Sequence, residues 1–221
     1  MPHWLQLMID SLPTLLWAGV KFTIPLTLLS FVLGLSLGLV TAVARLFGPW
    51  PVSAIARFYV WIIRGTPLLV QLFVIFYGLP SIGIVLPPWP SAVIALSVNV
   101  GGYAAEIIRA SILSVPRGQW EAGHTIGMSR ALTLRRIIVP QAARVSVPPL
   151  SNTFISLVKD TSLASVILVT ELFKQAQLIA SSTFEYMLLY LEAALIYWLV
   201  CLVLSFAQTR LERRLDRYVA H

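Results

Sequence analysis

The sequence contains few charged residues. Only 11% of its 221 residues are Asp, Glu, Lys or Arg, whereas 58% are hydrophobic. A soluble globular protein usually has about 25% charged residues, so this chain has too few to cover a surface that faces water. The composition therefore predicts an integral membrane protein whose exterior is largely covered by lipid.

The sequence also lacks the motifs of common enzymes. No glycine is followed by lysine, which excludes the phosphate-binding loop G-x-x-x-x-G-K-[ST]. The zinc-protease motif H-E-x-x-H is absent as well. The single cysteine, Cys201, cannot form an intrachain disulfide. We therefore expect no catalytic residue, no metal site and no cofactor in this chain.

Five apolar stretches are each long enough to cross a bilayer, whose core of about 30 Å needs about 20 residues of helix. Helices are expected because backbone polar groups in lipid must be satisfied within each segment. The sequence thus predicts an all-α membrane protein with one domain over 1–221. The expected spans are 22–44, 58–79, 92–113, 145–169 and 186–207. Residues 1–13 contain no Lys or Arg, whereas a secretory signal begins with a positively charged region. We therefore expect a separate, uncleaved interfacial helix there. A loop is expected over 171–185.

Thirteen arginines indicate the orientation. All lie in, or near the membrane edge of, the turn at 45–64, the loop at 109–144 and the basic tail at 210–217. If the chain crosses the membrane five times, these three regions lie on the same side of the membrane. Because Lys and Arg accumulate in cytoplasmic loops, we expect the N-terminus outside and the C-terminus inside. Topology accounts for most of these arginines, and the alternatives for the rest are binding of nucleic acid or of specific lipids.

The loop at 114–144 is patterned. Apolar residues recur at intervals along a stretch that could form helix, and Gly118, Gly127 and Pro140 interrupt this stretch. This pattern predicts two short helices against the membrane face, with small residues where another surface could approach. Two interpretations remain open, an amphipathic helix lying on the headgroups and an element that docks another protein.

The loop resembles a known family motif. Glu121-Ala122-Gly123, then Gly127, then Ile137-Ile138-Val139-Pro140 resembles the EAA loop of permease subunits of binding-protein-dependent (type I) ABC importers. The spacing is the same; Gly123 replaces the second alanine of the motif and Val139 replaces its leucine.

Further motifs extend the resemblance over nearly the whole chain. They are similar to the polar amino-acid branch of these permeases, with cystine-type permeases closest. These segments are 64–67, 105–109, 115–122, 140–144 and 159–163.

The resemblance implies that the loop docks onto a cytoplasmic ATPase, which binds ATP and Mg²⁺. It further implies two ATPase subunits, a second permease in a homo- or heterodimer, an external solute-binding protein and a bacterial inner membrane. The residues expected to couple to the ATPase are Trp120, Glu121, Ala122, Gly123, Gly127 and Met128.

Charges inside a span usually face the interior of the helix bundle, because exposing them to lipid is unfavourable. Lys159 and Asp160 lie in the fourth expected span, either as a structural pair or beside a zwitterionic substrate. Adjacent residues on a helix do not face each other, which favours Asp160 as a lining residue. Pro67 cannot donate a backbone hydrogen bond; it forms either a simple kink or a broken helix of the kind that lines transporter sites.

Asn99, Tyr103 and Glu106 share one helix face. We expect Asn99 to contact substrate and Glu106 to have a structural role with Arg109. Gly34 and Gly38 form a small-residue pair that packs helices within the subunit or at a dimer. The residues expected along the substrate path are Gly65, Thr66, Pro67, Asn99, Tyr103, Thr153, Lys159, Asp160 and Ser162.

The sequence as a whole predicts the permease of an importer for a neutral or zwitterionic polar amino acid. One alternative is a membrane scaffold or sensor that recruits a cytoplasmic ATPase without moving solute. Another is a secondary transporter driven by an ion gradient, against which the short chain and the absence of an inverted repeat argue.

Overall fold

The computed structural model describes residues 2–216, with side chains through residue 214. Met1 and Arg217 of the expected domain and tail lie outside the described residues. This part of the chain contains helices and no strand. The α-helices, with π- or 3-10-helical segments marked η, are α1 (His3–Ala18), η1 (Gly19–Thr23), α2 (Ile24–Phe47), α3 (Trp50–Gly65), α4 (Leu68–Phe73), η2 (Val74–Gly78), η3 (Leu79–Ile82), α5 (Pro88–Ser114), α6 (Arg117–Thr125), α7 (Arg130–Thr133), η4 (Leu134–Ile138), α8 (Val139–Asp160), η5 (Thr161–Ile167), α9 (Leu172–Thr183) and α10 (Tyr186–Asp216).

The first helix is longer than expected. α1, η1 and α2 continue into one another over His3–Phe47, so the prediction of a separate interfacial helix over 1–13 is wrong. The π-helical turn η1 keeps the backbone helical across Gly19. Thr23 in this turn is buried, and its hydroxyl accepts a bond from the Leu172 amide at 3.2 Å, which ties the long helix to the start of α9.

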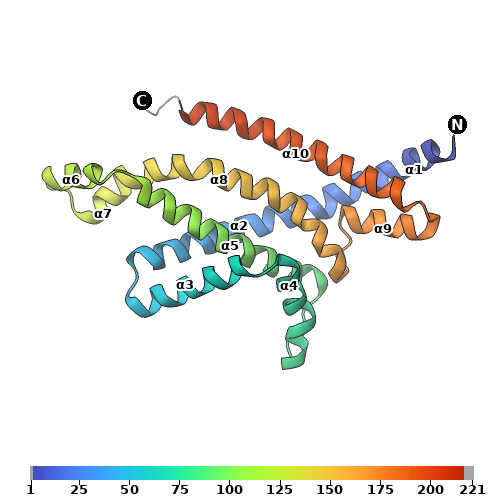
Figure 1. Cartoon of the computed structure of the whole chain (residues 1–221), viewed down its shortest axis with the longest axis horizontal. Helices are drawn as coiled ribbons and strands as arrows, with labels where there is room; N and C mark the ends of the chain where they lie inside the picture. Colours follow the sequence, from blue (N-terminus) through green and yellow to red (C-terminus); the bar gives the residue numbers. More distant parts are fainter. Residues whose placement is uncertain (1, 217–221) are drawn as a thin grey trace.

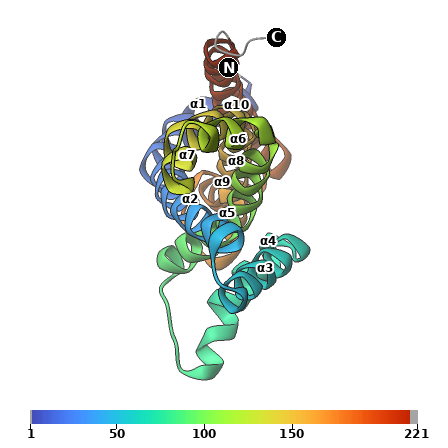
Figure 2. The ribbon, with the colours of Figure 1, turned by 90° about the vertical axis from the view of Figure 1, so that its left-hand side faces the viewer.

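The second apolar stretch is broken. α3 and the segment Leu68–Ile82 meet at 109°, with Thr66 and Pro67 extended between them. The expected span at 58–79 is therefore not a straight helix. Figure 2, viewed toward α6 and α7, shows α3 and α4 standing away from the body that the other helices form.

Three helices in the described chain are long and apolar enough to cross a membrane, or up to five if each bent pair forms one span. The second bent pair joins Arg130–Ile167 to Leu172–Thr183 at 49°. The expectation of a loop over 171–185 is wrong, because α9 fills most of it. Glu171 caps this helix, since its carboxylate accepts bonds from the amides of Phe173 and Lys174.

The body is built on the contact between α2 and α5. A Cβ atom at Gly34 would lie 2.6 Å from the Cβ of Val100, and one at Gly38 would lie 2.6 Å from the Cβ of Ala104. Such distances are too short for any side chain, so the two backbones approach closely only because both residues are glycine. The small-residue pair thus packs helices within the subunit.

The arginine-rich segments lie at one end of the molecule. Figure 1 shows the α2–α3 turn, α6, α7 and the C-terminal end of α10 together, with α9 and the start of α1 at the other end. That they share one side of the membrane stays a prediction.

Candidate functional site

The loop at 114–144 folds into two helical segments joined by a tight turn. α6 ends with a Schellman arrangement in which the Gly127 amide donates to the His124 carbonyl and the Met128 amide donates to the Gly123 carbonyl, both at 3.0 Å. Gly127 has φ of 78°, a left-handed conformation that glycine adopts without strain. The Ser129 hydroxyl then accepts from the Leu132 amide and caps α7. The interruption of the helix expected at Gly127 is confirmed, whereas Gly118 lies within α6 and Pro140 within α8.

The inner face of this loop packs on the body. Trp120 contacts a buried cluster that includes Ile112, Val115 and Ile138. A Cβ atom at Gly123 would lie 2.6 Å from the Thr133 side chain. The expectation that Gly123 leaves room for an external surface is therefore wrong, since the chain itself occupies that space.

The outer face of α6 is free of contacts with the body. Glu121 and Ala122 are exposed, and Ile126 at its end is 75% exposed. An exposed isoleucine beside a carboxylate and a small residue forms a compact mixed surface on a helix that its inner contacts hold in place. This surface can dock onto another protein.

A hydrogen-bonded amide lies at the break in the second apolar stretch. The Gln71 amide nitrogen donates to the Ile63 carbonyl at 2.9 Å and to the Thr66 hydroxyl at 2.9 Å. Its oxygen accepts from the Asn99 amide at 3.0 Å. The structure thus brings two expected site residues, Thr66 and Asn99, together through a residue that the sequence interpretation missed. The available signal was a glutamine in an apolar run four residues after Pro67.

Tyr103 and Gly65 line a neighbouring cavity of about 460 Å³. The guanidinium of Arg64 lies 5.7 Å from the centre of the Tyr103 ring, a cation–π distance.

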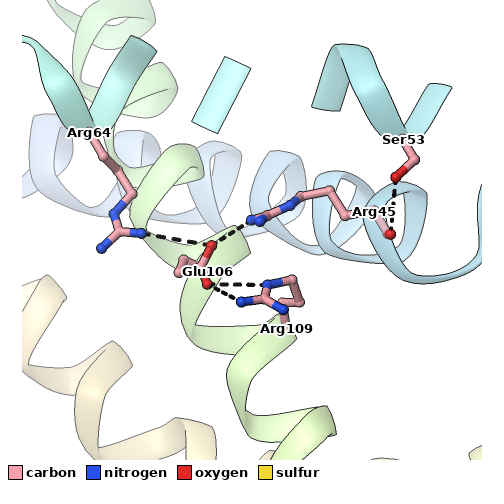
Figure 3. A network of polar contacts seen from close by, with 5 residues as sticks. All are labelled: Arg45, Ser53, Arg64, Glu106 and Arg109. Carbon is pink, nitrogen blue, oxygen red and sulfur yellow. Dashed lines mark hydrogen bonds and ion pairs between the residues drawn. The ribbon is translucent and has the colours of Figure 1, made fainter. Parts of the chain in front are cut away.

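An ion cluster forms at the same cavity (Figure 3). One Glu106 oxygen accepts from Arg45 at 2.6 Å and lies 3.7 Å from Arg64. The other oxygen lies 2.5 Å from Arg109, so the expected structural pairing of Glu106 with Arg109 is present. The Arg45 carbonyl accepts from the Ser53 hydroxyl at 3.2 Å. Sequence spacing identified only Arg109 as a partner of Glu106, because Arg45 and Arg64 belong to other helices.

The remaining expected site residues lie on α8 and η5. Lys159 and Ser162 line a separate cavity of about 480 Å³ that includes Tyr197 and Trp198 of α10. Asp160 is half-buried, and the Thr153 hydroxyl donates to the Pro149 carbonyl within its own helix. The described contacts do not join these residues to the group around Asn99.

The family of the chain follows from comparison with known proteins. Residues 34–217 match the family described as the binding-protein-dependent transport system inner membrane component. The chain belongs to this family, whose members are permease subunits.

Individual relatives agree with this placement. The chain is 61% identical to the L-cystine transport system permease protein TcyB of Bacillus subtilis over 93% of this chain and 88% of that one. It is 40% identical to the glutamine transport system permease protein GlnP of Escherichia coli over 91% of this chain and 93% of that one.

Solved structures share the fold. A crystal structure of an amino acid ABC transporter with histidines matches with a TM-score of 0.91 at 37% identity, covering 97% of this chain and 99% of that one. The MetNI methionine ABC transporter matches with a TM-score of 0.73 at 20% identity, covering 91% of this chain and 96% of that one, and this likeness concerns the fold alone.

Proposed function

We propose that this chain is the membrane-spanning subunit of an ATP-driven importer that moves a polar amino acid into the cytoplasm of a bacterium. The cargo in this proposal is cystine or another neutral or zwitterionic amino acid. The observation that carries the proposal is the loop at 114–144, which packs on the body through Trp120 and leaves Glu121 and Ala122 exposed. The relatives named for cystine and glutamine transport support the class of cargo.

Separate subunits complete the assembly in this proposal. A cytoplasmic ATPase pair binds ATP and Mg²⁺, a second permease subunit of the same or a different sequence forms the other half of the pathway, and a solute-binding protein delivers the amino acid. The family description, which names a binding-protein-dependent system and an inner membrane component, supports these partners and the bacterial inner membrane as the location.

The packing of the loop supplies a route for force. Movement of α6 passes through Trp120 to the cluster at the end of α5. Movement of α7 passes directly into the body, because Arg130–Ile167 is helical without a break through α7, η4, α8 and η5. A push at the outer face therefore displaces two body helices as rigid elements, which is the behaviour required for domain closure.

The substrate path in this proposal includes the break at Gly65-Thr66-Pro67 with Asn99 and Tyr103. Thr153, Lys159, Asp160 and Ser162 on the fourth span supply further polar groups. Broken helices line binding sites in transporters because their freed backbone groups can face a cavity, and the Gln71 bonds to Thr66 and Asn99 give this break a defined geometry.

We expect Glu121→Lys to uncouple transport. A charge reversal that places like charges together across an interface costs several kcal/mol, which corresponds to more than about tenfold in affinity for the ATPase. The measurement is ATP-dependent uptake into vesicles that contain this chain, its ATPase and its solute-binding protein. Glu185→Lys, a charge reversal at an exposed residue between α9 and α10, should transport normally.

Three results of this assay separate the alternatives. ATP-dependent uptake by the wild type supports the importer, whereas copurification of the ATPase without any uptake would support a scaffold. Uptake that follows an ion gradient without ATP would support a secondary transporter. Normal uptake by Glu121→Lys would remove α6 from the coupling role.

We expect Asn99→Ala and Asp160→Ala to lower uptake at least about tenfold, because each removes a group whose hydrogen bond to a charged substrate is worth about 1.5–3 kcal/mol. Uptake is measured at matched amounts of assembled transporter. Asn152→Ala is the control, since this amide accepts a bond from Gln208 on the exposed side of α8. Normal uptake in both test variants would mean that the substrate path lies elsewhere.

A further inference from the structure

The largest cavity described for this chain lies between the loop at 114–144 and the ends of α2 and α5, and Glu121 is not among its lining residues. Its volume is about 960 Å³, near the upper end of the range of about 300–1,000 Å³ for small-molecule sites. Trp120, Met128 and Thr133 form part of its wall. The proposed docking to an ATPase uses the outer face of α6 and leaves this cavity unexplained.

The cavity carries uncompensated positive charge. Arg117 at the start of α6 and Arg130 at the start of α7 both line it, as does His124. No aspartate or glutamate is among the lining residues. Neither arginine belongs to an ion pair in the part of the chain that the structure describes. The two guanidinium groups are therefore available to an anion from outside the chain.

The floor of the cavity is apolar. It consists of Leu46 and Phe47 from the last turn of α2 and Ile112 and Leu113 from the last turn of α5. Phe47 is 42% exposed and Leu113 is 59% exposed. Both helices pass the length and hydropathy criteria for membrane spans, so the cavity lies where two spans end, with apolar groups on the membrane side and arginines beyond them.

We propose that this cavity binds an anionic phospholipid of the cytoplasmic leaflet, with the phosphate between Arg117 and Arg130 and the start of the acyl chains against Phe47 and Leu113. The sidedness rests on the orientation in the proposed function. Arginine matches phosphate with two parallel donors, tryptophan is favoured at headgroup depth, and basic pockets between spans on the cytoplasmic side suit such headgroups. The apolar floor favours a lipid over free phosphate, which has nothing to place there.

The bound lipid has a mechanical consequence. Arg117 and Arg130 lie on opposite sides of the Gly127 turn, so one phosphate held by both joins α6 to α7. This link stiffens the loop and improves transmission of force from the docking surface to the body. Lipid composition then influences coupling without any change in the docking surface itself.

Native mass spectrometry of the purified full chain tests the proposal. The chain is mixed in detergent with equal amounts of phosphatidylglycerol and phosphatidylcholine, and the retained lipid is counted. We expect the wild type to prefer phosphatidylglycerol and the double variant Arg117→Gln/Arg130→Gln to lose this preference by at least about tenfold, since bonds to charged groups contribute about 1.5–3 kcal/mol each. The control Arg135→Gln/Arg136→Gln removes the same charge from loop residues that do not line the cavity and should retain the preference.

Each other outcome overturns the proposal. Equal losses in the two double variants would indicate general attraction to a basic loop, and an unchanged preference in Arg117→Gln/Arg130→Gln would place the lipid elsewhere. Soluble glycerol phosphate that binds as well as phosphatidylglycerol would indicate an anion site without a lipid. If Arg117→Gln/Arg130→Gln weakens ATPase copurification equally in vesicles of pure phosphatidylcholine and in vesicles with phosphatidylglycerol, the cavity belongs to a protein interface.

The lipid-binding measurement uses no ATP and no cargo, so failure of the importer assay does not decide the lipid proposal.

Discussion

Gly34→Leu should lower the free energy of unfolding by at least about 3 kcal/mol, the upper part of the range for overpacking a well-filled interior. A Cβ atom at this position would meet the Val100 side chain at 2.6–2.7 Å and the Ser97 carbonyl oxygen at 2.8 Å. The carbonyl belongs to the backbone of α5 and cannot rotate away, so α2 and α5 must separate. The check is thermal unfolding in detergent followed by tryptophan fluorescence, where each kcal/mol corresponds to about 2–4 °C in a chain of this size.

Gly78→Leu is the matched control for this substitution. Gly78 has helical φ and ψ, and a Cβ atom there would meet nothing closer than 3.8 Å. The same leucine should therefore change the unfolding temperature little. Equal unfolding temperatures for the two variants would contradict the close packing of α2 on α5.

Glu106→Gln should destabilise the chain by about 3 kcal/mol. Removing one member of a buried ion pair typically costs about 3–5 kcal/mol, and the lower end applies because the Glu106 side chain is 23% exposed. The substitution leaves Arg45, whose side chain is only 12% exposed, near Arg64 and Arg109 without a neutralising charge. The measurement is again thermal unfolding in detergent.

Two further variants make the origin of this effect testable. Glu185→Gln removes an exposed carboxylate and should change stability by less than about 0.5 kcal/mol. Arg45→Gln combined with Glu106→Gln should cost less than the sum of the single changes by about 1 kcal/mol or more, because residues in one ionic network are energetically coupled. Strict additivity would show that Glu106 acts without Arg45.

Local features were predictable where a nearby residue decides the backbone. Pro67 has no backbone donor, and the chain breaks beside it. Gly127 has no Cβ and adopts the positive φ that the turn after α6 requires. Glu106 and Arg109 are one helical turn apart, so their pairing could be expected from spacing alone.

Errors occurred where a distant segment decides the outcome. The loop expected over 171–185 forms α9, which the Glu171 cap begins and which the Tyr197 hydroxyl supports by donating to Glu171 at 2.6 Å. Gly123 appeared to leave space for a partner, but Thr133 fills that space. In each case a contact from another element takes part, from Tyr197 of α10 to Glu171 and from Thr133 of α7 to Gly123, and spacing along the sequence does not reveal it.

The sequence by itself determined that the chain enters a membrane, that its arginines gather in three segments and that residues 114–144 resemble a coupling loop, because composition and local pattern decide these properties. Only the tertiary structure decided that Gly34 and Gly38 join α2 to α5, that Gln71 links Thr66 to Asn99, and that three helices surround Glu106 with arginines. These arrangements depend on how helices far apart in the chain pack, since a side chain meets its partner only after the backbones have come together.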